Sequence, residues 1–487
     1  MSDLLLYYQR PEPATWVFLS SFLLLTMYFV FHRFFSVRNL DLLLLLLLAP
    51  GLMMVYEGRR LQMSPIPEIT QPLVLKQADL ESSRQQPSQT FPVALVQGGA
   101  NSLQEDSGSS EAESPGSLEY LPQVSNGWEP GYLEFLGFVF LLVACAFLLI
   151  RMLIDPALVR RPLLVPNLSM GGLNFIGISL FLFLMANIVT STPREQEARS
   201  PSLGPGYLLL NMLPALPTSL SETPEENAGG EQPPPAWLPN LVRVFAILSN
   251  LAIVLGIVGV GYWHFDNVKT GVGCAVMYLI LPYTAQMTGN LQHTVPAAFL
   301  VLALLTYRQP LVAGVLLGMA SGLVYYPLFL LPLWISFYWY RGLWPFISGV
   351  LSSLAVLMLL LAFQGSDFGE NIKQMWGLWL PRMENLSGIW DSEYGFPAEF
   401  RVPTLVACIL LSASFVFWPT RKTLGSLMCG TAAIMLAIQF WHGFGGGLFM
   451  AWFLPFILLT IFRPNLDDRI ATNVVRLRRR LPEKAPA

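Results

Sequence analysis

Apolar runs of membrane-crossing length recur along almost the whole chain, and this repetition limits the folds open to it. Most of these runs are about 16–22 residues long, close to the length that an α-helix needs to cross the hydrocarbon core of a bilayer. Hydrophobic residues make up 54% of the 487 positions and charged residues only 12%, well below the charged fraction of a soluble domain. We therefore predict an all-α, multi-pass integral membrane protein.

The apolar runs predict one transmembrane helix bundle over residues 1–487, with about thirteen spans. The expected spans are residues 16–32, 40–56, 131–152, 170–190, 239–262, 269–284, 294–307, 310–324, 326–340, 344–363, 403–418, 425–441 and 446–462. The first run lacks the basic segment that precedes the apolar part of a cleavable signal peptide, so we expect no such signal.

Under this count of spans, lysine and arginine gather on one side of the membrane. They follow odd-numbered spans, and the largest group is in the tail, residues 463–487. The excess of Lys and Arg in cytoplasmic loops predicts that this side, with the tail, faces the cytoplasm. Arg59 and Arg60 are the main exception. We expect a location in a cell membrane, the cytoplasmic membrane of a bacterium, with the even-numbered exits outside.

Three long connections fall on the outer side. Residues 57–130 and 192–238 are rich in Pro, Gln, Ser, Gly and Glu and poor in apolar residues, so we expect mostly disordered tethers. Residues 364–402 differ, because they carry aromatic side chains and charges of both signs. Ile372, Trp376 and Trp379 recur there at helical spacing, which predicts a short helix lying in the membrane interface.

No sequence motif indicates a metal ion, a cofactor or a nucleic-acid partner. All four cysteines lie within apolar runs, where we interpret them as small core residues and not as disulfides or metal ligands: Cys145, Cys274, Cys408 and Cys429. The net charge of −3 carries little information about partners, because orientation depends on where Lys and Arg lie and not on their sum.

Residues 287–342 contain the most distinctive succession of sequence features in the chain. A polar tip with Asn290 and His293 leads into an apolar run that ends at a basic corner, Arg308. Glycines then recur at every fourth position, at Gly314, Gly318 and Gly322. Small residues at this spacing share one helix face and let a neighbouring helix approach closely. We therefore expect the first two of these glycines to lie against another helix.

The next features of this stretch are Tyr325, Tyr326 and Pro327, which follow an Ala-Gly-x-Leu-Leu-Gly segment. Together with the polar tip, it resembles the family-87 glycosyltransferases of the GT-C superfamily over roughly a tenth of the chain. The resemblance implies a GT-C-like membrane enzyme that transfers a sugar from a polyprenyl-phosphate donor to an acceptor outside the cytoplasm. Val324 is a departure, because the family usually has a lysine at this place.

Such a transfer needs a carboxylate to accept the proton of the acceptor hydroxyl. The resemblance implies an Asp or Glu in the first long outer loop, and Glu57 matches that place, one helix later than is usual. Asp367 and Asp391, in the aromatic outer loop, are the alternative bases. Glu57 can equally be an ordinary interface anchor, and the charges of the aromatic loop can simply be solvated.

Cations and hydrogen-bond donors must also hold the donor phosphate. The candidates are His293, Asn290, Arg59, Arg60, Tyr325 and Tyr326. A histidine at a membrane face can donate to a phosphate oxygen, but His293 can also be a structural residue bonded to a neighbouring loop. His442 lies in a turn that its glycines explain without any ligand.

Three functions therefore remain open. The first is the transferase, with a lipid-linked sugar donor and membrane lipid as partners, and with residues 283–293 and 364–402 facing one cavity that opens to the outer leaflet. The second is a non-catalytic GT-C-like scaffold of an envelope polysaccharide system, which Val324 favours, with partners in envelope biosynthesis. The third is a transporter or flippase, although the spans are almost free of the ionisable residues that ion-coupled transport uses.

Overall fold

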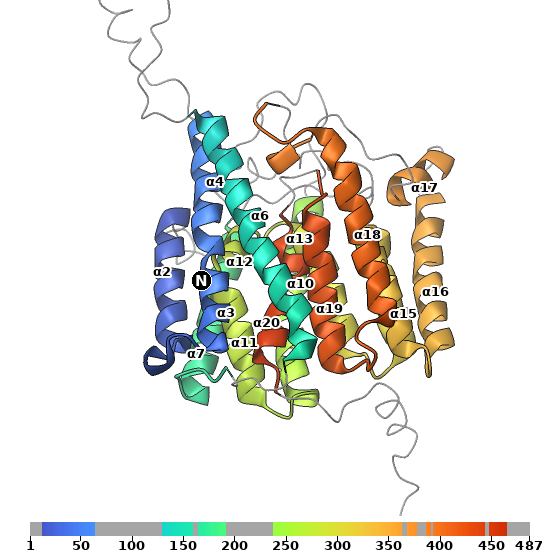
Figure 1. Cartoon of the computed structure of the whole chain (residues 1–487), viewed down its shortest axis with the longest axis horizontal. Coiled ribbons are helices and arrows are strands. Elements are labelled where there is room, and N and C mark those ends of the chain that lie inside the picture. The colour runs from blue at the N-terminus through green and yellow to red at the C-terminus, as the bar shows by residue number, and fades with distance from the viewer. Residues whose placement is uncertain are drawn as a thin grey trace, which may run out of the picture.

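The structure is a computed structural model, and it describes residues 12–63, 129–158, 164–190, 237–362, 368–376, 386–390, 393–443 and 448–464. The regular elements in these ranges are all helices, and most of them pack side by side along one common direction (Figure 1). We call the end of the bundle that holds Arg463 the tail end. The opposite end, which holds residues 368–376 and 386–390, is the loop end.

In chain order, the α-helices are α2 (Pro13–Tyr28), α3 (Val37–Leu46), α4 (Leu48–Met63), α6 (Pro130–Ile154), α7 (Met170–Val189), α10 (Trp237–Trp263), α11 (Val268–Ile280), α12 (Pro282–Gln286), α13 (Leu291–Leu305), α14 (Pro310–Leu323), α15 (Leu331–Tyr338), α16 (Leu343–Ala362), α17 (Phe368–Trp376), α18 (Arg401–Phe417), α19 (Leu424–Gln439) and α20 (Leu454–Phe462). Short 3-10 helices connect them: η1 (Phe31–Arg33), η2 (Asp155–Ala157), η3 (Tyr326–Leu330), η4 (Gly388–Trp390), η5 (Ala398–Phe400) and η7 (Met450–Trp452). Capping side chains fix several helix starts, because they accept a backbone N–H of the first turn: Ser36, Ser169, Asn267 and Thr423.

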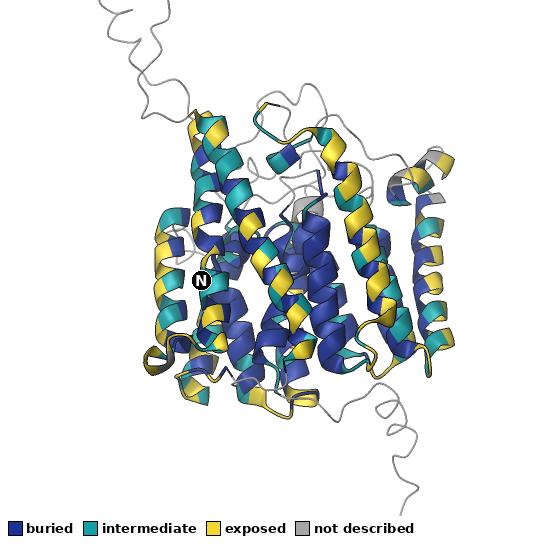
Figure 2. Ribbon diagram, in the orientation of Figure 1, coloured by how far each residue is buried: buried dark blue, intermediate teal, exposed yellow. Residues whose placement is uncertain are grey.

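Within the described ranges, six helical segments are long and apolar enough to cross a membrane: Val37–Gln62, Pro130–Ala157, Met170–Val189, Asn240–Trp263, Leu343–Leu361 and Ala398–Phe417. Their outward faces are apolar, as on α7, where Phe175, Ile178 and Leu182 are exposed. In contrast, every residue of α19 and α20 is buried, so these two helices form the centre of the bundle (Figure 2). Apolar helices that expose apolar faces are typical of a membrane protein, as the composition predicted.

Several helices have nearly the predicted bounds, for example α6 and α16, but others differ from the prediction. The first span ends at Tyr28 and not at 32, and the span predicted for 326–340 is divided into η3 and α15. The chain stays helical to Met63, so the first residues of the expected 57–130 insert belong to α4. Helix α11 ends at Ile280, because Pro282 starts the separate helix α12. The last helix, α20, begins only at Leu454, and a 3-10 turn replaces the expected helix before it.

The structure also bears on the predictions for the cysteines, the aromatic loop and the two inserts. All four cysteines are buried and none of them forms a disulfide, which confirms them as core residues. Helix α17 contains Ile372 and Trp376, as their helical spacing predicted. Trp379 lies outside the described residues, and a position in the membrane interface stays a prediction. Residues 64–128 and 191–236, which make up most of the two inserts, lie outside the described residues, as does the tail from 465 onward.

The glycine face of α14 packs against α16, which confirms the close helix contact predicted from the sequence. A Cβ atom added at Gly314 would overlap the carbonyl oxygen of Phe346. One added at Gly318 would overlap the Ser353 hydroxyl and lie 2.8 Å from the carbonyl oxygen of Val350. The two helix backbones are therefore in contact at a distance that leaves no room for a larger residue on this face of α14.

We expect Gly318→Leu to lower the free energy of unfolding by about 1–3 kcal/mol, because the added side chain must push α16 away from α14. The control is Gly171→Leu on α7, where an added Cβ meets no atom within 4 Å. Thermal melting of the purified protein in detergent measures both changes. Equal melting temperatures for the two variants would contradict the close α14–α16 contact.

Candidate functional site

His293 lies at the loop end, in the first turn of α13, and is buried. Its Nδ1 atom is hydrogen-bonded to the hydroxyl of Tyr283, on α12. Its ring stacks on Phe449, with 4.2 Å between the ring centroids and 24° between the ring planes. His293 is therefore held by its own tip and by the segment before α20, which agrees with the structural interpretation that the sequence left open.

Helix α10 and η7 hold the tip that carries His293 in place. The side-chain amide of Asn250 donates to the carbonyl oxygen of Thr288 over 2.9 Å, and the hydroxyl of Ser249 donates to that of Thr294 over 2.9 Å. Trp452 donates its indole N–H to the carbonyl oxygen of Gln292. The tip is thus a fixed part of the bundle.

Asn290 precedes α13 and supports the helix start mainly through its backbone. Its carbonyl oxygen accepts the backbone N–H groups of His293 and Thr294, each over 3.1 Å. Its side-chain amide lies 3.2 Å from the sulfur of Met287. The half-buried Asn290 side chain is thus directed along its own tip.

Tyr325 and Tyr326 belong to the same group of rings as His293. They follow the end of α14, where Pro327 stops the helix and η3 begins. Their rings stack on one another at 4.2 Å, and the ring of Tyr326 lies 4.7 Å from that of His442. His442 in turn lies 4.6 Å from Phe449, on which His293 stacks. We call this group the aromatic cluster: Tyr283, His293, Tyr325, Tyr326, Trp441, His442, Phe449 and Trp452.

Arg401, the first residue of α18, lies beside the aromatic cluster and was not singled out from the sequence. Its side chain is only 1% exposed. Its Nε atom donates to the carbonyl oxygen of Trp441 over 3.1 Å, and its guanidinium group lies against Gly443. The only sequence signal is an arginine at the start of an apolar run, which is also typical of an ordinary interface residue.

Glu57, Arg59 and Arg60 lie on α4, near the loop end, and take part in its packing against α6. Arg59 forms an ion pair with Glu134 of α6 over 2.8 Å, and Arg60 lies 3.5 Å from Glu57, one turn away. Within the described part of the chain, neither Glu57 nor Arg59 is hydrogen-bonded to His293 or to Tyr326. The structure therefore does not join these candidates to the aromatic cluster.

The aromatic outer loop contacts Gly443, the residue after His442 of the cluster, through residues 386–390. The backbone N–H of Ser387 donates to the carbonyl oxygen of Gly443 over 3.2 Å. Farther along, the hydroxyl of Tyr394 donates to a carboxylate oxygen of Glu129 over 2.6 Å, and this hydrogen bond raises the pKa of Tyr394. Asp367 and Asp391 lie outside the described residues, so the cavity expected between this loop and residues 283–293 stays a prediction.

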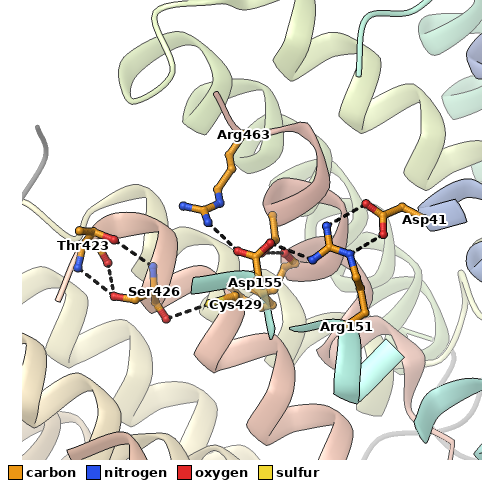
Figure 3. Close-up of polar contacts among 9 residues, drawn as sticks. Asp41, Arg151, Asp155, Thr423, Ser426, Cys429 and Arg463 are labelled. Carbon is orange, nitrogen blue, oxygen red and sulfur yellow. Dashed lines mark hydrogen bonds and ion pairs between the residues drawn. The ribbon is translucent and has the colours of Figure 1, made fainter. Parts of the chain in front are cut away.

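A second polar group, the charge cluster, lies at the tail end (Figure 3). Arg151 of α6 donates to both carboxylate oxygens of Asp41 on α3, over 2.6 and 3.0 Å, and to Asp155 over 3.0 Å. Asp155 also accepts from Arg463, which follows α20, over 2.5 Å. The two aspartates and two arginines cancel in charge, and together they connect α3, α6 and the end of α20.

The two clusters have different chemistry. The charge cluster pairs each carboxylate with a guanidinium, so its contacts serve to hold three segments of the chain together. The aromatic cluster gathers rings, hydroxyl groups and imidazoles, and Arg401 is bonded to the carbonyl oxygen of one of its members, Trp441. Apolar and aromatic side chains with a few polar groups are typical of ligand sites. We therefore take the aromatic cluster with Arg401 as the candidate functional site. Comparison with protein-family models, with curated proteins and with solved structures finds no match to this chain.

Proposed function

We propose that the chain crosses the membrane about thirteen times, with the tail end in the cytoplasm and the loop end outside. These proposed spans comprise the six long apolar segments and the shorter apolar helices of the bundle. Their arrangement supports it, because the connections at the tail end carry basic residues, as the positive-inside rule expects: Arg308, Arg341, Arg421 and Lys422. The aromatic cluster then lies near the outer leaflet.

At that site, we propose transfer of a sugar from a polyprenyl-phosphate donor to an acceptor outside the cytoplasm. One observation carries the proposal. Tyr325 and Tyr326, which belong to the segment that resembles the family-87 glycosyltransferases, meet His293, the candidate from the polar tip, in a single aromatic cluster. Residues 386–390, from the loop that carries the candidate bases, lie beside that cluster.

The proposed reaction requires little covalent chemistry from the protein itself. The acceptor hydroxyl attacks the anomeric carbon, the bond from that carbon to the phosphate oxygen breaks, and the lipid phosphate leaves with the electron pair. A carboxylate takes the hydroxyl proton, and Asp391 or Asp367 of the outer loop is the proposed base, with Glu57 as the alternative. Hydrogen-bond donors near the phosphate stabilise the charge that develops on the leaving group.

Deleting the gene in its host tests the function, because the deletion should change the lipid-linked sugars and envelope glycans seen by mass spectrometry. Restoring the deletion with Asp391→Asn should leave transfer reduced by about 10²–10³, the usual loss when one electrostatic contact to the reacting groups is removed. His293→Ala should reduce transfer as well. Full restoration by both variants, at normal expression, would rule out the catalytic role.

A non-catalytic scaffold is the second candidate, and one observation favours it. His293 is bonded to Tyr283 and stacked on Phe449, so its burial is explained by packing alone. Val324, where the family usually has a lysine, is buried as well. A scaffold predicts that the deletion changes the glycans while the Asp391→Asn variant restores them completely.

A further inference from the structure

Exposed aromatic rings lie beside arginines at three turns of the tail end. The arginines follow the ends of α13, α15 and α18, in that order: Arg308, Arg341 and Arg421. Three rings close to them in the sequence are 81%, 78% and 80% exposed, in this order: Tyr340, Trp344 and Phe417. Rings and arginines of this kind gather where a transmembrane helix leaves the bilayer. We call these six residues the tail-end patch.

The turns that carry the patch lie next to one another. A Cβ atom added at Gly342 would lie 2.5 Å from Cγ of Pro310, so the turn after α15 packs against the turn before α14. On the other side, the carbonyl oxygen of Phe415 in α18 accepts hydrogen bonds from Ser336 of α15 and from Nζ of Lys422. The ends of α15 and α18 and the start of α16 therefore present one surface at the tail end (Figure 1).

The positive charge of this surface is not balanced within the part of the chain that the structure describes. The ion pairs in that part involve other arginines, and none of them includes an arginine of the tail-end patch. Two acids of the tail end, Asp41 and Asp155, are paired with arginines in the charge cluster. A surface with surplus arginines at the level of the headgroups attracts anionic lipids more than zwitterionic ones.

Apolar helix faces continue from the patch toward the loop end. Leu351 and Leu359 are exposed on α16, and Ile409 and Leu410 are exposed on α18 (Figure 2). Such faces suit acyl chains, while the arginines and the rings of the patch suit the headgroup. Phosphate oxygens match the paired N–H groups of a guanidinium. The surface thus has a place for each part of a phospholipid.

We propose that the tail-end patch binds anionic phospholipids, with the headgroup phosphate at the arginines and the acyl chains along α16 and α18. The inference goes beyond the proposed sugar transfer and does not depend on it, because the patch lies at the opposite end of the bundle from the candidate site. A lipid bound there also supports α16, which packs mainly against α14.

Lipid binding to the purified full-length protein in detergent tests the patch. Native mass spectrometry compares phosphatidylglycerol with phosphatidylcholine that has the same acyl chains, and the wild type should prefer phosphatidylglycerol. Arg341→Gln should reduce this preference about fivefold, the effect expected of one arginine near an anionic headgroup. Replacing all three arginines of the patch with glutamine should abolish it. The control is Arg243→Gln on α10, an arginine bonded to Asn240, which should leave the preference unchanged.

A second measurement uses the contribution of the lipid to stability. Phosphatidylglycerol should raise the melting temperature of the wild type more than phosphatidylcholine does, and Arg341→Gln should reduce that difference. The single variant keeps the test valid if the triple variant fails to fold.

Three results would overturn the proposal. The first is equal binding of the two lipids by the wild type, and the second is an unchanged preference in a folded triple variant. The third is a loss for Arg243→Gln as large as that for Arg341→Gln, because the net charge of the protein would then explain the preference. Displacement of phosphatidylglycerol by inorganic phosphate would also contradict it, since the patch would then bind free anions and not lipid.

Discussion

Replacing Asp155 with asparagine is expected to lower the free energy of unfolding by about 3–5 kcal/mol, the usual cost of removing one partner from a buried ion pair. Asp155 is fully buried and accepts hydrogen bonds from both Arg151 and Arg463 (Figure 3). Asparagine has nearly the same shape, so packing is preserved. It cannot balance two guanidinium groups, however, and the charge cluster is left with an excess positive charge.

A matched control is Glu57→Gln on α4. Glu57 also pairs with an arginine, but both side chains of that pair are partly exposed and 3.5 Å separates Arg60 from Glu57. Ion pairs of this kind contribute only about 0–1 kcal/mol. Thermal melting in detergent compares the two variants, and a loss for Asp155→Asn as small as that for Glu57→Gln would contradict the proposed role of the charge cluster.

Asp41→Asn gives an internal check on the same cluster. Asp41 and Asp155 share Arg151, so their substitutions should not be additive. Once one aspartate is replaced, Arg151 keeps a single carboxylate partner, and the second replacement then leaves it with none. We therefore expect the double variant to lose more stability than the sum of the single losses.

Much of the helical fold could be predicted from local patterns. Apolar runs mark α6 and α16 because a crossing helix needs a continuous apolar segment. The glycine spacing of α14 predicted its close contact with α16, because residues four apart share a face. The bounds of α20 were wrong, because the apolar run before it includes a 3-10 turn, η7, that composition does not reveal.

The partners of charged residues could not be predicted in the same way. Arg151 and Asp41 are 110 positions apart in the chain, and Arg463 and Asp155 are 308 apart. Such pairs form only once the helices have packed, and no local pattern in a single sequence indicates which distant residues will pair. From the sequence alone, Arg151 and Arg463 were cytoplasmic basic residues, while the structure places them in buried ion pairs.

The residues of the candidate site could also be predicted only in part. Sequence order brought out His293, Tyr325 and Tyr326, and the structure gathers them in one cluster. The sequence did not indicate Arg401 as a site residue, because a lone arginine at the start of an apolar run is typical of membrane interfaces. Only the packing of α18 against the turn at Trp441 and Gly443 shows that this arginine faces inward.

Trp452→Ala is expected to lower the free energy of unfolding by about 3–5 kcal/mol, the cost of deleting a large buried aromatic side chain. Trp452 is fully buried, stacks on Phe449 at 4.4 Å and lies 5.5 Å from Tyr326. It also donates to the carbonyl oxygen of Gln292, so it joins η7 to the tip that carries His293. Its loss should loosen both halves of the aromatic cluster together.

Two further variants separate the causes of that loss. Trp452→Phe keeps a ring in place but leaves the buried oxygen of Gln292 without its donor, so about 1–3 kcal/mol of the loss should remain. Trp344→Ala, on α16, removes a tryptophan that is 78% exposed and should change the melting temperature little. If Trp452→Ala melts at the same temperature as Trp344→Ala, the aromatic cluster adds nothing to the stability of the bundle. Its rings would then have to be explained by a bound ligand and not by packing.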